Sequence, residues 1–181
     1  MSPHAPSMTL AIPVEPTDHM QGSEHARVTV VEYGDFECPS CKVAAPTPKL
    51  LLERFPSRIR FVFRHFPLQE AHPHALMAAE ASEAAAAQGK FWLMHDVLFQ
   101  NQAHLKDKDL QRYAADLGLD MARYTAEMDD QVYLQRIREH QQSGRDSGVR
   151  GTPTFFVNGA IQDVSFGMHA LFDAVAALLK K

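Results

Sequence analysis

The sequence predicts an α/β fold that carries an inserted all-helical subdomain. Three observations support this class. A strand–helix–strand pattern fills residues 28–66, a continuous stretch of helix-forming residues follows at 74–147, and a strand, a hairpin, a second strand and a helix close the chain at 154–179. A connecting helix places the first two strands parallel. The 181 residues are enough for one domain with a core, with or without an insertion.

The first strand is predicted at Val28–Tyr33, because a run of apolar residues is typical of a buried strand. Glu32 interrupts this run, and two interpretations stay open: an exposed glutamate at a strand end, or a partly buried carboxylate near a reactive site. A helix is expected at about 39–55, with a kink where Pro46 removes one backbone hydrogen bond. The alternating residues at 59–66 predict the second strand.

The N-terminal residues 1–26 are rich in Pro, Ser, His and Gly, which predicts a loosely ordered arm. Within it, Met8–Val14 is predicted as a short edge strand, because Pro13 has no N–H to donate to a central ladder. The start of the chain, Met1–Met8, has neither the charged beginning nor the apolar core of a secretory signal. We expect a cytoplasmic protein, or a periplasmic or otherwise extracytoplasmic one if the native start has been trimmed.

The middle of the chain predicts a block of helices. Its first helix is rich in alanine, which favours helix and lets a neighbouring helix approach closely. Gly89 and Gly118 are expected to end helices, and Asp120 to cap one. The expected helices cover residues 75–87, 91–99, 107–117, 120–128 and 131–146.

The last part of the chain predicts two strands and a helix. Thr154–Val157 reads as a strand, and Asn158-Gly159 after it favours a primed hairpin turn. The returning strand is expected at Ala160–Ser165. Apolar residues with helical spacing from Met168 onward predict a closing amphipathic helix.

The chain has two cysteines, Cys38 and Cys41, and both lie where the first helix is expected to begin. A secreted fold held by disulfides would use more cysteines and space them widely. Unpaired N–H groups and the positive end of a helix dipole favour a thiolate at the first position, and the thiolate is the nucleophile. We therefore expect Cys38 to attack and Cys41 to resolve, while redox and metal chemistry both remain open.

Composition argues against two classes of partner. The net charge of −4 and the absence of a Lys/Arg stripe give no footprint for nucleic acid. No apolar run approaches the roughly 18 residues of a membrane span. We expect neither a nucleic-acid partner nor a membrane span.

These motifs resemble those of DsbA-like thiol–disulfide oxidoreductases. The residues that carry the resemblance are Cys38-Pro39-Ser40-Cys41, the Glu-Tyr-Gly-Asp-Phe-Glu sequence before it, and Gly151-Thr152-Pro153-Thr154 ahead of the hairpin. The resemblance implies a thioredoxin-like fold, βαβ … ββα, with a helical insertion. Its parts would be a thioredoxin-like domain at 27–66 and 148–181, a helical insertion at 67–147, and the arm at 1–26.

The resemblance also implies roles for single residues. Cys38 and Cys41 match the redox pair, and Pro39 and Ser40 between them help set its potential and meet the substrate. Pro153 matches a cis-proline that lies beside the cysteines, and the backbone of Thr152 offers an edge to an extended substrate peptide. Glu32 matches a buried carboxylate that accepts a proton from Cys41.

The implied reaction is disulfide exchange with protein thiols or disulfides, in a direction that the sequence leaves open. It needs no cofactor beyond a redox-active disulfide and no metal, and an unidentified redox partner or glutathione would supply or remove the electrons. Two other classes remain. A metal-binding module would combine Cys38 and Cys41 with His65 or His72, and a chaperone-like module would bind unfolded chains on the helical block. His74, near an expected helix start, otherwise reads as a surface or capping residue.

Overall fold

The structure, a computed structural model, describes residues 8–181, and the start of the predicted arm at 1–7 lies outside the described residues. The chain forms two compact units. The described part of the first is residues 8–33, 46–64 and 142–181, and the second is residues 34–45 and 65–141.

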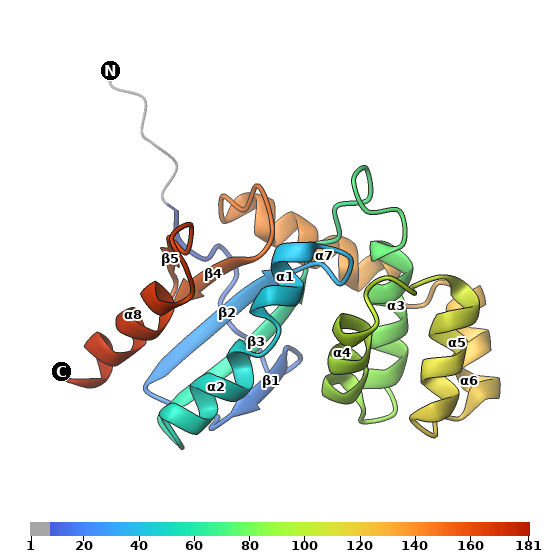
Figure 1. The fold of residues 1–181 in the computed structure, drawn as a ribbon, viewed down its shortest axis with the longest axis horizontal. Coiled ribbons are helices and arrows are strands. Elements are labelled where there is room, and N and C mark those ends of the chain that lie inside the picture. Colours follow the sequence, from blue (N-terminus) through green and yellow to red (C-terminus); the bar gives the residue numbers. More distant parts are fainter. Residues whose placement is uncertain (1–7) are drawn as a thin grey trace. The chain divides into compact units, whose positions relative to one another are not determined.

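The strands form one five-stranded sheet in the order β1-β3-β2-β4-β5 (Figure 1). The strand order agrees with an α/β fold in which the two strands of the first βα unit lie at the centre. The strands are β1 His19–Gly22, β2 Val28–Gly34, β3 Ile59–His65, β4 Thr154–Val157 and β5 Ala160–Gln162.

The two central strands are parallel, as two side-chain hydrogen bonds between them show. Arg60 Nε donates to Thr29 Oγ1 over 3.0 Å, and Arg64 Nη1 donates to the Tyr33 hydroxyl over 3.2 Å. The partners are 31 positions apart in both pairs, so four residues along β3 correspond to four residues along β2 in the same direction. The predicted βαβ unit is confirmed. β1 pairs antiparallel with β3, and β4 pairs antiparallel with β2.

A short edge strand does lie in the predicted arm, but not where the sequence placed it. β1 at His19–Gly22 is the edge strand, whereas Met8–Val14 contributes only an isolated bridge from Thr9 to Ala160. Pro13 has no N–H to donate to a ladder, and its carbonyl group accepts a side-chain hydrogen bond instead. The prediction of a strand at Met8–Val14 is therefore wrong.

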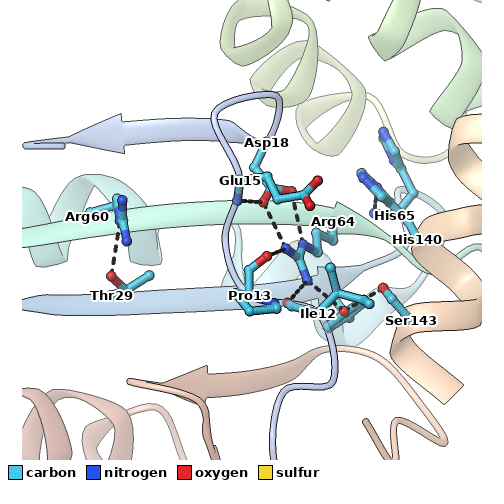
Figure 2. Close-up of polar contacts among 11 residues, drawn as sticks. Ile12, Pro13, Glu15, Asp18, Thr29, Arg60, Arg64, His65, His140 and Ser143 are labelled. Carbon is cyan, nitrogen blue, oxygen red and sulfur yellow. Dashed lines mark hydrogen bonds and ion pairs between the residues drawn. The ribbon is translucent and has the colours of Figure 1, made fainter. Parts of the chain in front are cut away.

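A buried arginine holds the arm against the sheet (Figure 2). The Arg64 guanidinium, on β3, lies 3.0 and 2.8 Å from the two carboxylate oxygens of Asp18. It also donates to the carbonyl oxygens of Ile12 and Pro13, over 2.8 and 2.9 Å. The arm is ordered at these residues because one charged side chain satisfies several acceptors, so the expectation of a loosely ordered arm is wrong there.

The predicted first helix is broken into two. α1 spans Pro39–Ala44 and α2 spans Thr47–Arg54, with Pro46 between them as the N-cap of α2. Proline cannot continue the backbone hydrogen bonds of a helix, and its carbonyl oxygen instead accepts from Leu50 N over 3.1 Å. In place of one kinked helix there are two helices, and Ala45 and Pro46 between them keep right-handed helical backbone angles. α1 belongs to the second unit and α2 to the first.

The second unit is built around α3, which contacts α4, α5 and α6 (Figure 1). The predicted close packing is confirmed, because six of its alanines are buried, namely Ala75, Ala78, Ala79, Ala81, Ala84 and Ala85. Asp120 caps α6 as expected, accepting from Arg123 N over 3.0 Å. The helices of this unit are α3 Ala75–Ala86, α4 Phe91–Gln100, α5 Asp107–Asp116 and α6 Met121–Asp129. The next helix, α7 Leu134–Asp146, begins in this unit, and its residues from 142 onward belong to the first unit.

The hairpin and last helix follow the prediction closely. Asn158 and Gly159 have φ of 47° and 81°, as a primed turn requires. The returning strand ends at Gln162 rather than at the predicted residue 165, because the Asp163 carboxylate accepts from Ser165 N over 2.9 Å and forms a turn. α8, His169–Leu179, packs on β4 and β5. None of the helices between residues 8 and 181 has both the length and the apolar character of a membrane span.

Candidate redox site

The two cysteines lie at the first turn of α1. Cys38 is the N-cap residue, with extended backbone angles, and Pro39 occupies the first helical position, where its missing N–H costs nothing. Cys38 is 6% exposed, whereas Cys41 is completely buried at 0%. Both cysteines are buried, and Cys38 is the less buried of the two.

Residues 34–38, the lead-in segment, run up to and include Cys38. The buried Asp35 makes hydrogen bonds that fix this segment. This carboxylate is 1% exposed. Its Oδ1 accepts from Glu37 N over 2.7 Å, and its Oδ2 accepts from Leu68 N over 2.9 Å and lies 2.7 Å from His72 Nδ1. The main-chain oxygen of Asp35 accepts from Cys38 N over 3.1 Å. Asp35 thus fixes the backbone of Glu37 and Cys38 at the start of α1 and ties it to the loop after β3.

Two further side chains hold the lead-in segment. Glu37 accepts from His74 N over 2.7 Å, and its other oxygen lies 2.9 Å from His74 Nδ1. The amide of Gln102 donates to the carbonyl oxygens of Phe36 and Cys38, over 2.9 and 2.8 Å. All of these residues belong to the second unit. The backbone around Cys38 is therefore held by contacts with two other segments, the loop at 68–74 and Gln102.

Sequence reasoning missed Asp35, Glu37 and Gln102. One signal was present: two carboxylates two positions apart, Asp35 and Glu37, pair in order with two histidines two positions apart, His72 and His74. Gln102 carries no comparable signal, because a single glutamine in a loop after a helix is unremarkable in sequence.

The Asp35 carboxylate perturbs His72. Partial burial lowers the pKa of this imidazole, but the hydrogen bond and charge of Asp35, together with the charges of Cys38 and Glu37, outweigh burial and raise the pKa above its usual 6.5. His72 is therefore charged up to a higher pH than an isolated histidine, and the charge of Cys38 acts on it electrostatically.

Phe36 anchors the lead-in segment to the helices of the second unit. Its ring is 1% exposed and lies 5.0 Å from the Phe99 ring and 5.9 Å from the His95 ring, measured between centroids. Both neighbours are on α4, the helix that also contacts α1. This aromatic cluster gives the cysteine-bearing turn a rigid base.

The other predicted site residues belong to the first unit. Glu32 is 1% exposed on β2, opposite Phe155 of β4, so the interpretation as an exposed glutamate is wrong. The Thr152–Pro153 peptide bond is cis and directly precedes β4. Thr154 Oγ1 donates to the Gly151 carbonyl oxygen over 2.7 Å and closes this loop. Ser40, like the two cysteines, lies in the second unit.

Within residues 8–181, no group of three or more His, Cys, Asp or Glu side chains close enough to share an ion includes either cysteine. The metal-binding alternative proposed for the cysteine pair therefore gains no support from the ligand groups in the described part of the chain.

Solved structures of similar fold include a thioredoxin-like oxidoreductase and a DsbA protein. A thioredoxin-like oxidoreductase from Silicibacter pomeroyi DSS-3 is 28% identical with a TM-score of 0.81, over 92% of this chain and 95% of that one. DsbA2 from Pseudomonas aeruginosa is 27% identical with a TM-score of 0.72, over 93% and 98%. Oxidised BdbD from Bacillus subtilis, 23% identical over 91% and 94%, shares the fold with a TM-score of 0.80. The fold and the position of the cysteine pair are those of a DsbA-like thioredoxin-fold protein.

The model of the protein family described as thioredoxin matches residues 14–176. The chain belongs to this thioredoxin family.

Curated relatives carry a different name. A protein named Na(+)/H(+) antiporter NhaA 1 from Salinispora arenicola is 48% identical over 169 residues, which are 93% of this chain and 26% of that protein. Another, named Na(+)/H(+) antiporter NhaA, from Herminiimonas arsenicoxydans, is 44% identical over 153 residues, or 84% and 24%. The chain spans about a quarter of the length of these relatives.

Proposed function

We propose that this chain exchanges disulfides with protein substrates through Cys38-Pro39-Ser40-Cys41. The observation that carries the proposal is the unequal burial of the two cysteines at the first turn of α1, with 6% of Cys38 and none of Cys41 exposed. An attacking sulfur must meet the substrate, and a resolving sulfur must be shielded from it. Protein thiols or disulfides are the substrates, and glutathione or a redox protein restores the enzyme.

In the oxidising direction, a substrate thiolate attacks the Cys38 sulfur of the Cys38–Cys41 disulfide. The disulfide breaks, Cys41 leaves as a thiolate and takes a proton, and a mixed disulfide joins Cys38 to the substrate. A second substrate thiolate attacks the substrate sulfur of that bond and expels the Cys38 thiolate. The substrate gains a disulfide, and two electrons pass to the enzyme. The reducing direction is the reverse sequence.

Three residues of the first unit have roles in the proposed exchange, in proton transfer and in substrate binding. Glu32, a buried carboxylate on β2, accepts and returns the proton of Cys41. Thr152 and Pro153 present the backbone to which an extended substrate pairs. In a Glu32→Gln variant the alkylation of Cys41 should slow, with Glu53→Gln, an exposed glutamate of α2, as control. Unchanged Cys41 reactivity would show that Glu32 has no part in proton transfer.

The roles of the cysteines are tested with single variants. Cys38→Ser should abolish exchange with a peptide that contains two thiols, whereas Cys41→Ser should accumulate a mixed disulfide that denaturing electrophoresis resolves. Equal trapping by both variants would refute the roles. The equilibrium of the wild-type pair with glutathione then gives the direction, because it measures the redox potential itself.

The curated relatives favour one class of partner. They resemble this chain over about a quarter of their length and are named as Na(+)/H(+) antiporters. We propose a membrane antiporter with accessible thiols as a partner of Cys38. The Cys41→Ser variant, mixed with membranes that contain such an antiporter, should form a mixed disulfide with it, and Cys38→Ser should not. Equal recovery of the antiporter with both variants would contradict this partner.

A further inference from the structure

The exchange mechanism above makes no use of His72, although this histidine is bound beside the redox site. His72 follows β3 and precedes α3, and its Nδ1 lies 2.7 Å from Oδ2 of the fully buried Asp35 side chain. The imidazole keeps 19% of its surface exposed, so solvent protons reach it. A titratable ring held by a buried carboxylate has a fixed place and an open route for protons.

Asp35 connects this histidine to the reactive cysteine. The side chain of Asp35 binds His72, and its main-chain oxygen accepts from Cys38 N over 3.1 Å. His72 also interacts electrostatically with Cys38 itself. The ring and the sulfur are thus related through one rigid, hydrogen-bonded turn within the second unit.

The charges around His72 are one-sided. Asp35, Glu37 and the Cys38 thiolate are the groups that act on it, and all three are negative. Glu37 is itself bound by His74. A neutral His72 would leave the buried Asp35 carboxylate without its compensating charge, which is costly in a poorly solvated place, and would remove the positive charge on which the Cys38 thiolate acts. The imidazolium offsets that charge most fully when the cysteine pair is reduced.

We propose that His72 is a positioning residue for the redox site, whose imidazolium, held by Asp35, stabilises the Cys38 thiolate and makes the redox equilibrium depend on one histidine proton. This inference rests on the proposed exchange function. It adds that the reduced enzyme is favoured while His72 is charged and loses this advantage once the ring is neutral.

The proton balance follows from linkage. Reduction by two substrate thiolates breaks the Cys38–Cys41 bond, oxidises the substrate pair to a disulfide, and yields the Cys38 thiolate and a Cys41 that takes one proton from solvent. The new negative charge on Cys38 raises the proton affinity of His72. At a pH between the His72 pKa values of the oxidised and reduced enzymes, reduction is therefore accompanied by partial uptake of a second proton, by His72. By reciprocity, the protonation of His72 favours reduction by the same factor.

The test measures both sides of this linkage. In wild type, NMR titration should give His72 a higher pKa in the reduced than in the oxidised enzyme, by a factor of about three or more in proton affinity, the scale of a partly exposed charge pair. In His72→Asn the amide still donates to Asp35. The proton affinity of Cys38, measured from thiolate absorbance, should rise by the same factor, and the equilibrium constant with glutathione should shift by that factor toward the oxidised enzyme.

The matched control is His74→Asn, which removes the neighbouring imidazole of the same loop and should leave the Cys38 pKa closer to wild type than His72→Asn does. The inference is overturned if His72 titrates identically in the two redox states, or if His72→Asn leaves the Cys38 pKa and the glutathione equilibrium unchanged. The NMR measurement needs no variant, so it decides the matter even if His72→Asn does not fold. Failure of the exchange function looks different: wild type itself would not equilibrate with glutathione.

Discussion

Arg64→Met is the sharpest test of how the first unit is held together. The substitution keeps a long side chain of similar shape but removes every donor of the guanidinium. Asp18, whose side chain is 5% exposed, then loses its two contacts with Arg64, at 3.0 and 2.8 Å, and its carboxylate keeps the hydrogen bond from Glu15 N at 2.8 Å. The Tyr33 hydroxyl loses its contact with Arg64 at 3.2 Å. Arg64 itself is 3% exposed at its side chain, so water does not screen the pair.

The magnitude follows from what is left behind. Ile12 and Pro13 are exposed, so their carbonyl groups regain water and contribute little. Asp18 is left as a buried charge without its cation, and removing one partner of such a pair costs about 3–5 kcal/mol. A domain of this size is stable by about 5–15 kcal/mol in total, so the variant should lose a large share of its free energy of unfolding.

Urea unfolding followed by circular dichroism measures this loss for Arg64→Met, Asp18→Asn and the double variant. The double variant should be less destabilised than the sum of the two single variants, because the second change removes a group that the first has already left unpaired. High salt should not remove the difference. A loss below about 1 kcal/mol in Arg64→Met, or strict additivity, would refute the reasoning, because exposed pairs behave in that way.

Three further predictions concern other parts of the fold. Burial lowers the pKa of His95 below 6.5, so as the pH falls below 6.5 the unfolded chain takes up this proton first and the free energy of unfolding decreases. In urea unfolding, His95→Gln should show a smaller decrease of the free energy of unfolding with falling pH. An unchanged pH dependence would contradict this. Gln102→Ala removes two hydrogen bonds to the lead-in segment and should cost about 1–3 kcal/mol and speed the alkylation of Cys38, whereas unchanged alkylation would mean that the segment is held without it. Gly159→Ala meets no atom within 4 Å at φ +81°, so its cost should be conformational alone, about 1–2 kcal/mol in the same unfolding assay; a much larger loss would indicate a clash.

Local features of the sequence were enough to predict most elements. The disturbance of the helix at Pro46, predicted as a kink, the turn at Asn158-Gly159 and the cap at Asp120 each depend on the chemistry of one or two residues and their immediate neighbours. The place of Cys38 and Cys41 at a helix start was predicted in the same way. The edge strand was misplaced because polar residues at His19–Gly22 pair with β3, and that pairing is invisible in the arm alone.

The sequence by itself determined the order of the elements, the place of the cysteine pair at a helix start and the turn that closes the sheet, because each follows from contacts between residues close along the chain. Only the tertiary structure decided that Glu32 is buried, that Arg64 binds Asp18, and that the lead-in segment binds His72, His74 and Gln102. Asp35 and His72 are 37 positions apart. Which carboxylate meets which histidine over such a separation depends on how the intervening strand and loops fold back, and no local pattern encodes that choice.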